Sequence, residues 1–184
     1  MTPDARNRAI GAGLAFTLFG LDQFAKWWVT GPLGVDELGD VIEIAPIFAL
    51  RFTQNFGVSM GMLQASSDLM RWGLVALTGA IAVVVTVWML RERRLGEIVP
   101  LALILGGALG NIRDRVQLGY VIDYADLHFG DFRPFFIFNL ADAAISIGVA
   151  IMLARALFVR DNSAQLVDEA MRQDQPAGPP ETTR

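Results

Sequence analysis

Four long apolar stretches constrain the fold of this chain more than any other feature of its sequence. A membrane helix needs about 20 predominantly apolar residues to cross roughly 30 Å of hydrocarbon. The chain has 184 residues, of which 53% are hydrophobic, more than is usual for a water-soluble domain. We therefore expect a mostly α, polytopic membrane protein with four transmembrane helices. The predicted spans are Ala9 to Thr30, Leu69 to Leu90, residues 98 to 115, and Phe135 to Val159.

The third of these stretches is the shortest. Its apolar part ends near Ile112 and reaches only about 22 Å at about 1.5 Å per residue. Either the helix continues through Arg113, Asp114 and Arg115, or these polar residues lie inside the membrane boundary. Both alternatives place charged side chains at membrane depth.

Basic residues on short loops predict how the spans are oriented, because Lys and Arg favour the cytoplasmic side of a membrane. Arg6 and Arg8 precede the first span, and Arg91, Arg93 and Arg94 lie between the second and third. Both chain ends are therefore predicted to be cytoplasmic. The first span is followed by LDQFAKWW, which has no small-residue cleavage site, so we expect it to be a retained helix and not a signal peptide.

The segments outside the spans divide into an outer platform and a tail. In residues 31–68, the run DVIEIAPIFALRFTQN mixes β-branched and aromatic residues, and Pro46 interrupts it. This pattern predicts a short edge-type sheet, and hence a small extracytoplasmic β-containing platform on a single membrane domain of residues 1–159. After Val159 the chain turns polar and ends in QPAGPPETTR, which predicts a disordered cytoplasmic tail over residues 160–184.

Composition excludes several kinds of chemistry. The chain has no cysteine, which excludes disulfides, thiolate catalysis and cysteine-based zinc sites. His128 is the single histidine of the sequence, so a histidine-rich metal site is excluded as well. The net charge of -4 gives no basic footprint for nucleic acid. We expect no metal, no cofactor and no nucleic-acid partner.

Two polar groups lie at or near the first outer connection. Asp22 and Lys26 are one helical turn apart and can pair on one face of the first span. This is either a structural pair in which Lys26 reaches toward the interface, or a direct contact to a substrate. Asn55 lies in TQNFGVSMG, residues 53–61, a segment that by its spacing is more often a turn than a binding loop.

A second polar region, GGALGNIRDRVQLGYVIDYAD, covers residues 106–126. Gly106 and Gly110 form a small-xxx-small pair that lets another helix approach closely. Asn111, Asp114 and Arg115 follow, and we expect from them a buried, hydrogen-bonded ion pair with an architectural role. The arginines of residues 113–133 break the charge rule for an outer loop, so we expect them to pair with nearby aspartates.

Two aspartates are predicted to reach the same depth at the outer leaflet. Asp123 is flanked by apolar residues, and Pro134 suits a helix start that puts Asn139 and Asp142 in the first two turns of the last span. Like-charge repulsion and desolvation keep one of two close carboxylates protonated, which gives a general acid beside a general base. Such a pair can hydrolyse a peptide bond without a metal. A proton relay or ion path in a transporter, and a purely structural hydrogen-bonded pair, are the open alternatives.

Four blocks of this sequence, LDQFAK, QNFGVSMG, GNIRDRVQLGYVIDY and FNLADAAISIG, together resemble the lipoprotein signal peptidases, or signal peptidase II, of bacteria. The resemblance covers roughly residues 10 to 158. It implies a membrane-embedded aspartic endopeptidase that cuts a prolipoprotein before its diacylglyceryl-modified cysteine, works as a monomer among membrane lipid, and has its active site toward the extracytoplasmic face. One departure is the second block, which in the family usually reads Asn-x-Gly-Ala-Ala-Phe.

The resemblance also implies roles for individual residues. Carried over by motif, Asp123 and Asp142 are the catalytic pair, and three further residues match positions of supporting role: Asp22, Lys26 and Asp114. The residues that match the family's polar groups around the substrate backbone or the two aspartates are Asn55, Asn111, Arg115 and Asn139.

Overall fold

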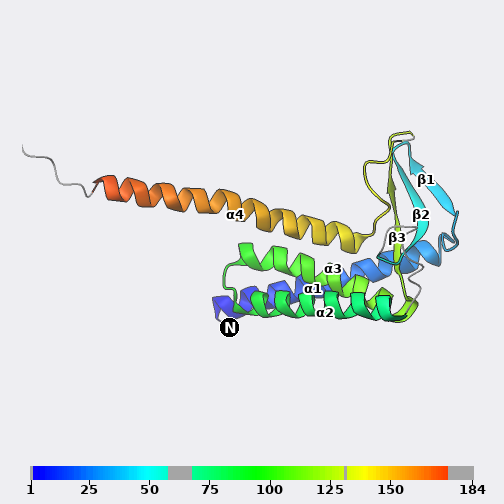
Figure 1. The fold of residues 1–184 in the computed structure, drawn as a ribbon, viewed down its shortest axis with the longest axis horizontal. Helices are drawn as coiled ribbons and strands as arrows, with labels where there is room; N and C mark the ends of the chain where they lie inside the picture. Colours follow the sequence, from blue (N-terminus) through cyan, green and yellow to red (C-terminus); the bar gives the residue numbers. More distant parts are fainter. Residues whose placement is uncertain (1, 58–67, 131, 174–184) are drawn as a thin grey trace, which may run out of the picture. The chain divides into compact units, whose positions relative to one another are not determined.

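A computed structural model describes residues 2–57, 68–130 and 132–173 of the chain (Figure 1). It divides into two compact units, Met1–Val149 and Ala150–Arg184. The described part of the second unit is the continuation of the last helix. The elements in chain order are α1 (Pro3–Thr30), β1 (Val41–Ala45), β2 (Phe48–Asn55), α2 (Asp68–Arg91), α3 (Leu95–Leu118), β3 (Val121–Leu127) and α4 (Leu140–Gln173).

The mostly helical membrane fold is confirmed. Three segments of the described chain are long and apolar enough to cross a membrane: Asp68–Arg91, Leu95–Leu118 and Leu140–Phe158. Helix α1 is 28 residues long, but it is not among these three. The polar residues of its second half, which include Asp22 and Lys26, lower its mean hydropathy. These two side chains are buried in the protein.

Helix α3 resolves the question raised by its short apolar run, because it continues well beyond Ile112. It ends at Leu118, and Gly119 follows in the left-handed conformation (φ 89°), which suits glycine. The backbone N–H of Gly119 donates to the carbonyl of Arg115. The polar residues of the run GNIRDR therefore lie on the last turns of a continuous helix.

Glycines on α3 let the neighbouring helices approach closely, as the spacing of Gly106 and Gly110 predicts. A Cβ at Gly106 would lie 2.7 Å from the carbonyl oxygen of Ala15 on α1, and one at Gly110 would collide with the carboxylate of Asp22. Gly107 faces α4 instead, where a Cβ would meet the carbonyl oxygen of Ala141. Helix α3 is thus in contact with α1 on one side and with the start of α4 on the other.

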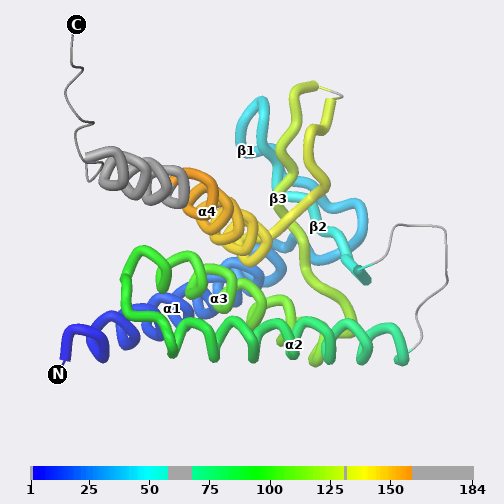
Figure 2. Tube along the Cα trace, turned by 60° about the vertical axis from the view of Figure 1, so that its left-hand side comes forward, coloured from blue at the N-terminus to red at the C-terminus, as the bar shows by residue number. Residues whose placement is uncertain are grey.

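The platform is a three-stranded antiparallel sheet in the order β1-β2-β3. Figures 1 and 2 show it at the end of the helices where α1 ends and α2 begins. Pro46 lies in the turn between β1 and β2, as its position in the sequence suggests. The third strand, which carries Asp123, was not predicted. A small core of Val29, Val35, Leu50 and Phe52 joins the sheet to the end of α1.

Helix α4 differs from the predicted span of residues 135–159 at both ends. It begins at Leu140, because the chain before it is extended: Phe138 pairs with Ala125 of β3, and Phe132 pairs with Phe129. It continues as helix to Gln173, so the predicted tail of residues 160–184 includes helical chain. Residues 174–184, and Val58 to Gly61 of the second family block, lie outside the described residues.

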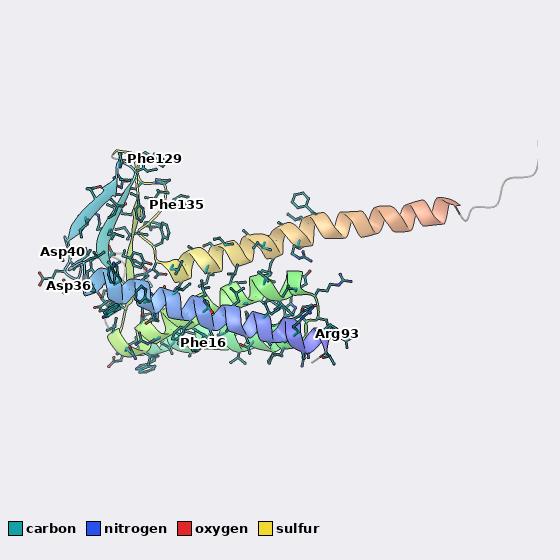
Figure 3. The ribbon with its side chains drawn as sticks, turned by 180° about the vertical axis from the view of Figure 1, so that it is seen from behind. Phe16, Asp36, Asp40, Arg93, Phe129 and Phe135 are labelled. Atoms are coloured by element: carbon teal, nitrogen blue, oxygen red, sulfur yellow. The ribbon has the colours of Figure 1, made fainter. Side chains whose placement is uncertain are left out.

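Acidic and basic loops lie at opposite ends of the helices. Figure 3 shows Asp36 and Asp40 beside the sheet and Arg93 at the far end of α1. The Asp40 carboxylate accepts hydrogen bonds from the backbone N–H groups of Asp36 (3.1 Å) and Glu37 (2.7 Å), which fixes the acidic loop. The charged loops at the two ends of the helices therefore differ in sign.

We predict that Gly107→Ala destabilises the protein by about 1–3 kcal/mol, because the added methyl group has to push the first turn of α4 off α3. Gly79→Ala on α2 is the matched control, since no described atom lies within 4 Å of its Cβ position, and alanine favours a helix over glycine. Thermal unfolding in detergent measures both. Equal unfolding temperatures for the two variants would contradict the close packing.

Candidate active site

Helix α4 is capped by Asn139, the residue directly before it. The backbone N–H of Asp142 donates to Asn139 Oδ1 (2.9 Å), and the backbone N–H of Asn139 donates to Asp142 Oδ2 (3.4 Å). This reciprocal pattern is a capping box built from asparagine and aspartate. It fixes the Asp142 carboxylate at the helix N-terminus, where the helix dipole favours negative charge.

The other oxygen of Asp142 is held from α3. Asn111 Nδ2 donates to Asp142 Oδ1 at 2.8 Å. The carbonyl oxygen of the same amide accepts from Lys26 Nζ (3.4 Å) and from Asn139 Nδ2 (3.2 Å). Both oxygens of Asp142 therefore have a hydrogen-bond donor, and three helices contribute to its surroundings.

Asp123 lies on β3 with 2% of its surface exposed, and two asparagines bind it. Asn139 Nδ2 donates to Oδ1 (2.7 Å), and Asn55 Nδ2 donates to Oδ2 (2.9 Å). Asn55 is itself oriented, because its side-chain oxygen accepts from the backbone N–H of Gly57 (2.8 Å). Asn55 is the last residue of β2, and its side chain binds one carboxylate of the predicted pair; residues 58–61 of the predicted turn lie outside the described residues.

A single fully buried residue, Asn139, joins the two carboxylates. Its side-chain N–H group binds Asp123, while its side-chain oxygen and backbone N–H are both bonded to Asp142. The two aspartates therefore lie together, as their common depth in the sequence predicts. Burial raises the pKa of Asp123 to about 7, the negative charge of Asp142 raises it as well, and the bonds from Asn55 and Asn139 oppose this shift.

Arg115 brings a positive charge to the same place. The charges of Asp142 and Asp123 both act on its guanidinium group, and a Cβ at Gly57 would lie 3.6 Å from its Nη2. Its Nε is buried and has no hydrogen-bond partner in the described part of the chain. The expected ion pair with Asp114 is wrong, because Asp114 binds Lys26 instead.

The residues predicted to support the site form a buried cluster of charges. Lys26 Nζ lies 2.8 Å from carboxylate oxygens of both Asp22 and Asp114. Asp22 Oδ1 accepts the backbone N–H of Ala141 (3.0 Å), in the first turn of α4, and Asp114 Oδ2 accepts that of Ile122 (3.3 Å), beside Asp123. The structural pairing of Asp22 with Lys26 is present, but Lys26 is buried and does not reach toward the interface.

Of the three arginines in residues 113–133, one has an aspartate partner among the described residues. Arg133 Nε lies 3.3 Å from Asp126, which also binds Arg51 Nε at 3.0 Å. Burial alone would raise the pKa of Asp126, but the hydrogen bonds from these two arginines hold it below its ordinary value. Arg113 instead donates to the side-chain oxygen of Gln23. The prediction of an aspartate partner is therefore wrong for Arg113.

Sequence reasoning missed two residues near this site. Gln23 donates to both Asp22 (3.1 Å) and Asp114 (3.0 Å), and its position next to Asp22 in LDQFAK was the available signal. Arg71 on α2 donates to the backbone carbonyl of Arg115, which no sequence pattern indicates. Within the described residues, no group of three or more His, Cys, Asp or Glu side chains is arranged to hold a metal ion.

The chain is similar throughout its membrane region to known enzymes. Residues 14–158 match the family described as signal peptidase (SPase) II. A lipoprotein signal peptidase of Sphingopyxis alaskensis is 51% identical over 163 residues, covering 88% of this chain and 94% of that protein. One of Caulobacter vibrioides is 35% identical, covering 85% of this chain and 92% of that protein.

The fold is similar to that of solved structures as well. A bacterial membrane enzyme solved by the in meso method at 1.9 Å resolution superimposes with a TM-score of 0.70 at 25% identity, over 82% of this chain and 94% of that one. The family match spans most of this chain, and the resemblance and the expected class of enzyme, a peptidase, are both confirmed. The chain belongs to the signal peptidase II family of membrane enzymes.

Proposed function

We propose that this enzyme removes signal peptides from diacylglyceryl-modified prolipoproteins, with Asp123 and Asp142 as its catalytic pair. The observation that carries the assignment is the bridge through Asn139, which bonds to both carboxylates at once. Both groups are engaged by uncharged amide donors, and within the described residues no lysine or arginine lies at bonding distance to neutralise them, unlike Asp22, Asp114 and Asp126. They keep the proton-transfer capacity that hydrolysis requires.

In the proposed reaction, Asp123 holds the proton shared by the pair at rest. Asp142 takes a proton from a water molecule as the water oxygen attacks the scissile carbonyl carbon, and Asp123 gives its proton to the carbonyl oxygen. The resulting gem-diol collapses when Asp142 passes its proton to the amide nitrogen. A hydroxyl proton of the gem-diol then returns to Asp123 as the C–N bond breaks, which leaves a carboxyl group and an amine.

Arg115, Asn55 and Asn111 are proposed to assist this reaction. Arg115 has an unpartnered N–H buried near both aspartates, so it is suited to a carbonyl oxygen of the substrate and to the negative charge that develops there. Asn55 and Asn111 each bind one aspartate and keep the two carboxylates in place. We propose that the charged cluster of Asp22, Lys26 and Asp114 supports the site structurally, without contacting substrate.

The membrane placement follows from the charges and the position of the site. We propose that both termini and the segment 160–184 are cytoplasmic, and that the sheet and the aspartates face outward from the bacterial inner membrane. An apolar signal peptide can then lie among the helices while its diacylglyceryl group stays in the outer leaflet. The depth of the aspartates selects the bond that is cut. One chain supplies both aspartates, Asp123 from β3 and Asp142 from α4, which supports a monomer.

We predict that Asp123→Asn and Asp142→Asn each lower cleavage of a diacylglyceryl-modified prolipoprotein by at least about 1,000-fold, since each removes one proton-transfer group. The matched control is Asp126→Asn, a buried aspartate of the same strand, which loses stability but keeps its rate per folded enzyme. The assay uses purified enzyme in detergent, with an unmodified substrate for comparison. Wild-type rates for either active-site variant would rule out the pair.

We predict that kcat/KM falls about tenfold per pH unit above pH 7. The pKa of Asp123 is about 7, so the required acid is present below this pH and is lost as the pH rises through it. Rates measured from pH 5 to pH 9 test this. Asp126→Asn should leave the profile unchanged. A rate that is constant up to pH 9 would assign the acid to another group.

We predict that the activity is resistant to EDTA. The carboxylate oxygens of the pair already accept hydrogen bonds from Asn55, Asn111 and Asn139, and the protons of these donors would repel a cation. Cleavage is measured before and after dialysis against the chelator. Loss of turnover that a divalent ion restores would contradict this prediction.

A further inference from the structure

The first turn of α2 reaches across to the end of α3 through Arg71. Its Nε donates to the carbonyl oxygen of Arg115 at 2.7 Å, and its Nη2 donates to that of Val116. Both carbonyls belong to the last turn of α3, where backbone oxygens have few partners within the helix, although that of Arg115 also accepts from the backbone N–H of Gly119. A cation at this end also interacts favourably with the helix dipole. Arg71 therefore caps α3 from a different helix.

The Arg71 side chain is held in this position from several sides. Its guanidinium carbon lies 5.1 Å from the ring centre of Trp72, within the range of a cation–π contact. Gly119, directly after α3, lies beside it: a Cβ there would be in ordinary contact, 3.8 Å from Arg71 Nη1. A guanidinium group bonded to two consecutive carbonyls has little freedom, so it fixes the backbone to which it is bonded.

That backbone carries Arg115, the cation beside the two aspartates. The Nε of the Arg115 side chain is buried and has no hydrogen-bond partner in the described residues, so no hydrogen bond from this atom fixes where its charge lies. The next turn of α2 also meets the site, because Leu74 packs tightly against Gly57, which binds and orients Asn55. The outer end of α2 thus supports the wall of the site that carries the positive charge.

We propose that Arg71 is a positioning residue: by holding the last turn of α3, it keeps the guanidinium group of Arg115 beside Asp123 and Asp142. The proposal rests on the function proposed above, in which Arg115 stabilises the charge that develops on the substrate. Arg71 itself contacts only backbone carbonyls and the Trp72 ring in the described structure. Its loss should therefore affect the rate of the chemical step more than substrate binding.

The test is a double-mutant cycle on the full-length enzyme in detergent, with a diacylglyceryl-modified prolipoprotein as substrate. Arg71→Met should lower kcat about 10- to 100-fold with less than about a twofold change in KM. If Arg71 acts through Arg115, Arg71→Met should have less than about a twofold further effect in an Arg115→Met background. Single-turnover rates at high enzyme concentration keep the slow variants measurable.

Two further variants separate positioning from a general loss of structure. Arg71→Lys keeps a donor for one carbonyl and should recover part of kcat, while Arg91→Met, the same change at the other end of α2, should leave kcat unchanged. If Arg71→Met does not fold, as judged by thermal unfolding, the cycle is run with Arg71→Lys. A wild-type kcat for Arg71→Met would overturn the proposal. So would a double variant whose loss of kcat equals the product of the losses in the two single variants. A wild-type enzyme that cleaves no prolipoprotein would overturn the proposed function instead.

Discussion

The arrangement of this membrane domain depends on the interaction of the buried Lys26 ammonium group with two carboxylates. The ammonium group lies between Asp22 and Asp114, and these two carboxylates in turn bind backbone N–H groups of α4 and β3. Three charges at this depth are costly unless all are paired and hydrogen-bonded, and removing one partner from such a cluster typically costs about 3–5 kcal/mol. The cluster therefore holds α1, α3, α4 and β3 in one fixed arrangement, and the site lies directly beside it.

The same ammonium group also orients the amides that bind the two aspartates. Lys26 is only a donor, so Asn111 must turn its oxygen toward it, which leaves the Asn111 N–H group for Asp142. The oxygen of Asn111 also accepts from Asn139, whose N–H group reaches Asp123 as well. The oxygen of Asn139 is then left for the backbone N–H of Asp142. A hydrogen-bond network whose amide orientations follow from one charge needs no rearrangement when substrate arrives, which suits the catalytic role proposed above.

The parts of this arrangement that were predictable are those set by hydropathy and helix period. Apolar length located the three segments that are able to cross a membrane, the predicted common depth of Asp123 and Asp142 indicated that they lie close together, and glycine spacing predicted that another helix approaches α3. The sequence did not predict which side chains pair with one another. Lys26 binds Asp114 because α1 and α3 touch at Gly110, a contact set by tertiary packing. The strand that carries Asp123 was missed because its pairing partner, β2, is about 70 residues earlier in the sequence.

Helix α1 shows how the polar site and membrane insertion depend on each other. Taken alone, it is not apolar enough to count among the likely membrane spans, and an unpaired Lys26 or Asp22 in hydrocarbon would cost about 2.5–3.5 kcal/mol on insertion scales. In the folded protein both side chains are buried against α3 and not in lipid, so this cost applies only before the helices associate. The charges that make α1 a poor span thus drive its packing against α3. The surroundings of Asp142 are complete only when α1, α3 and α4 have come together.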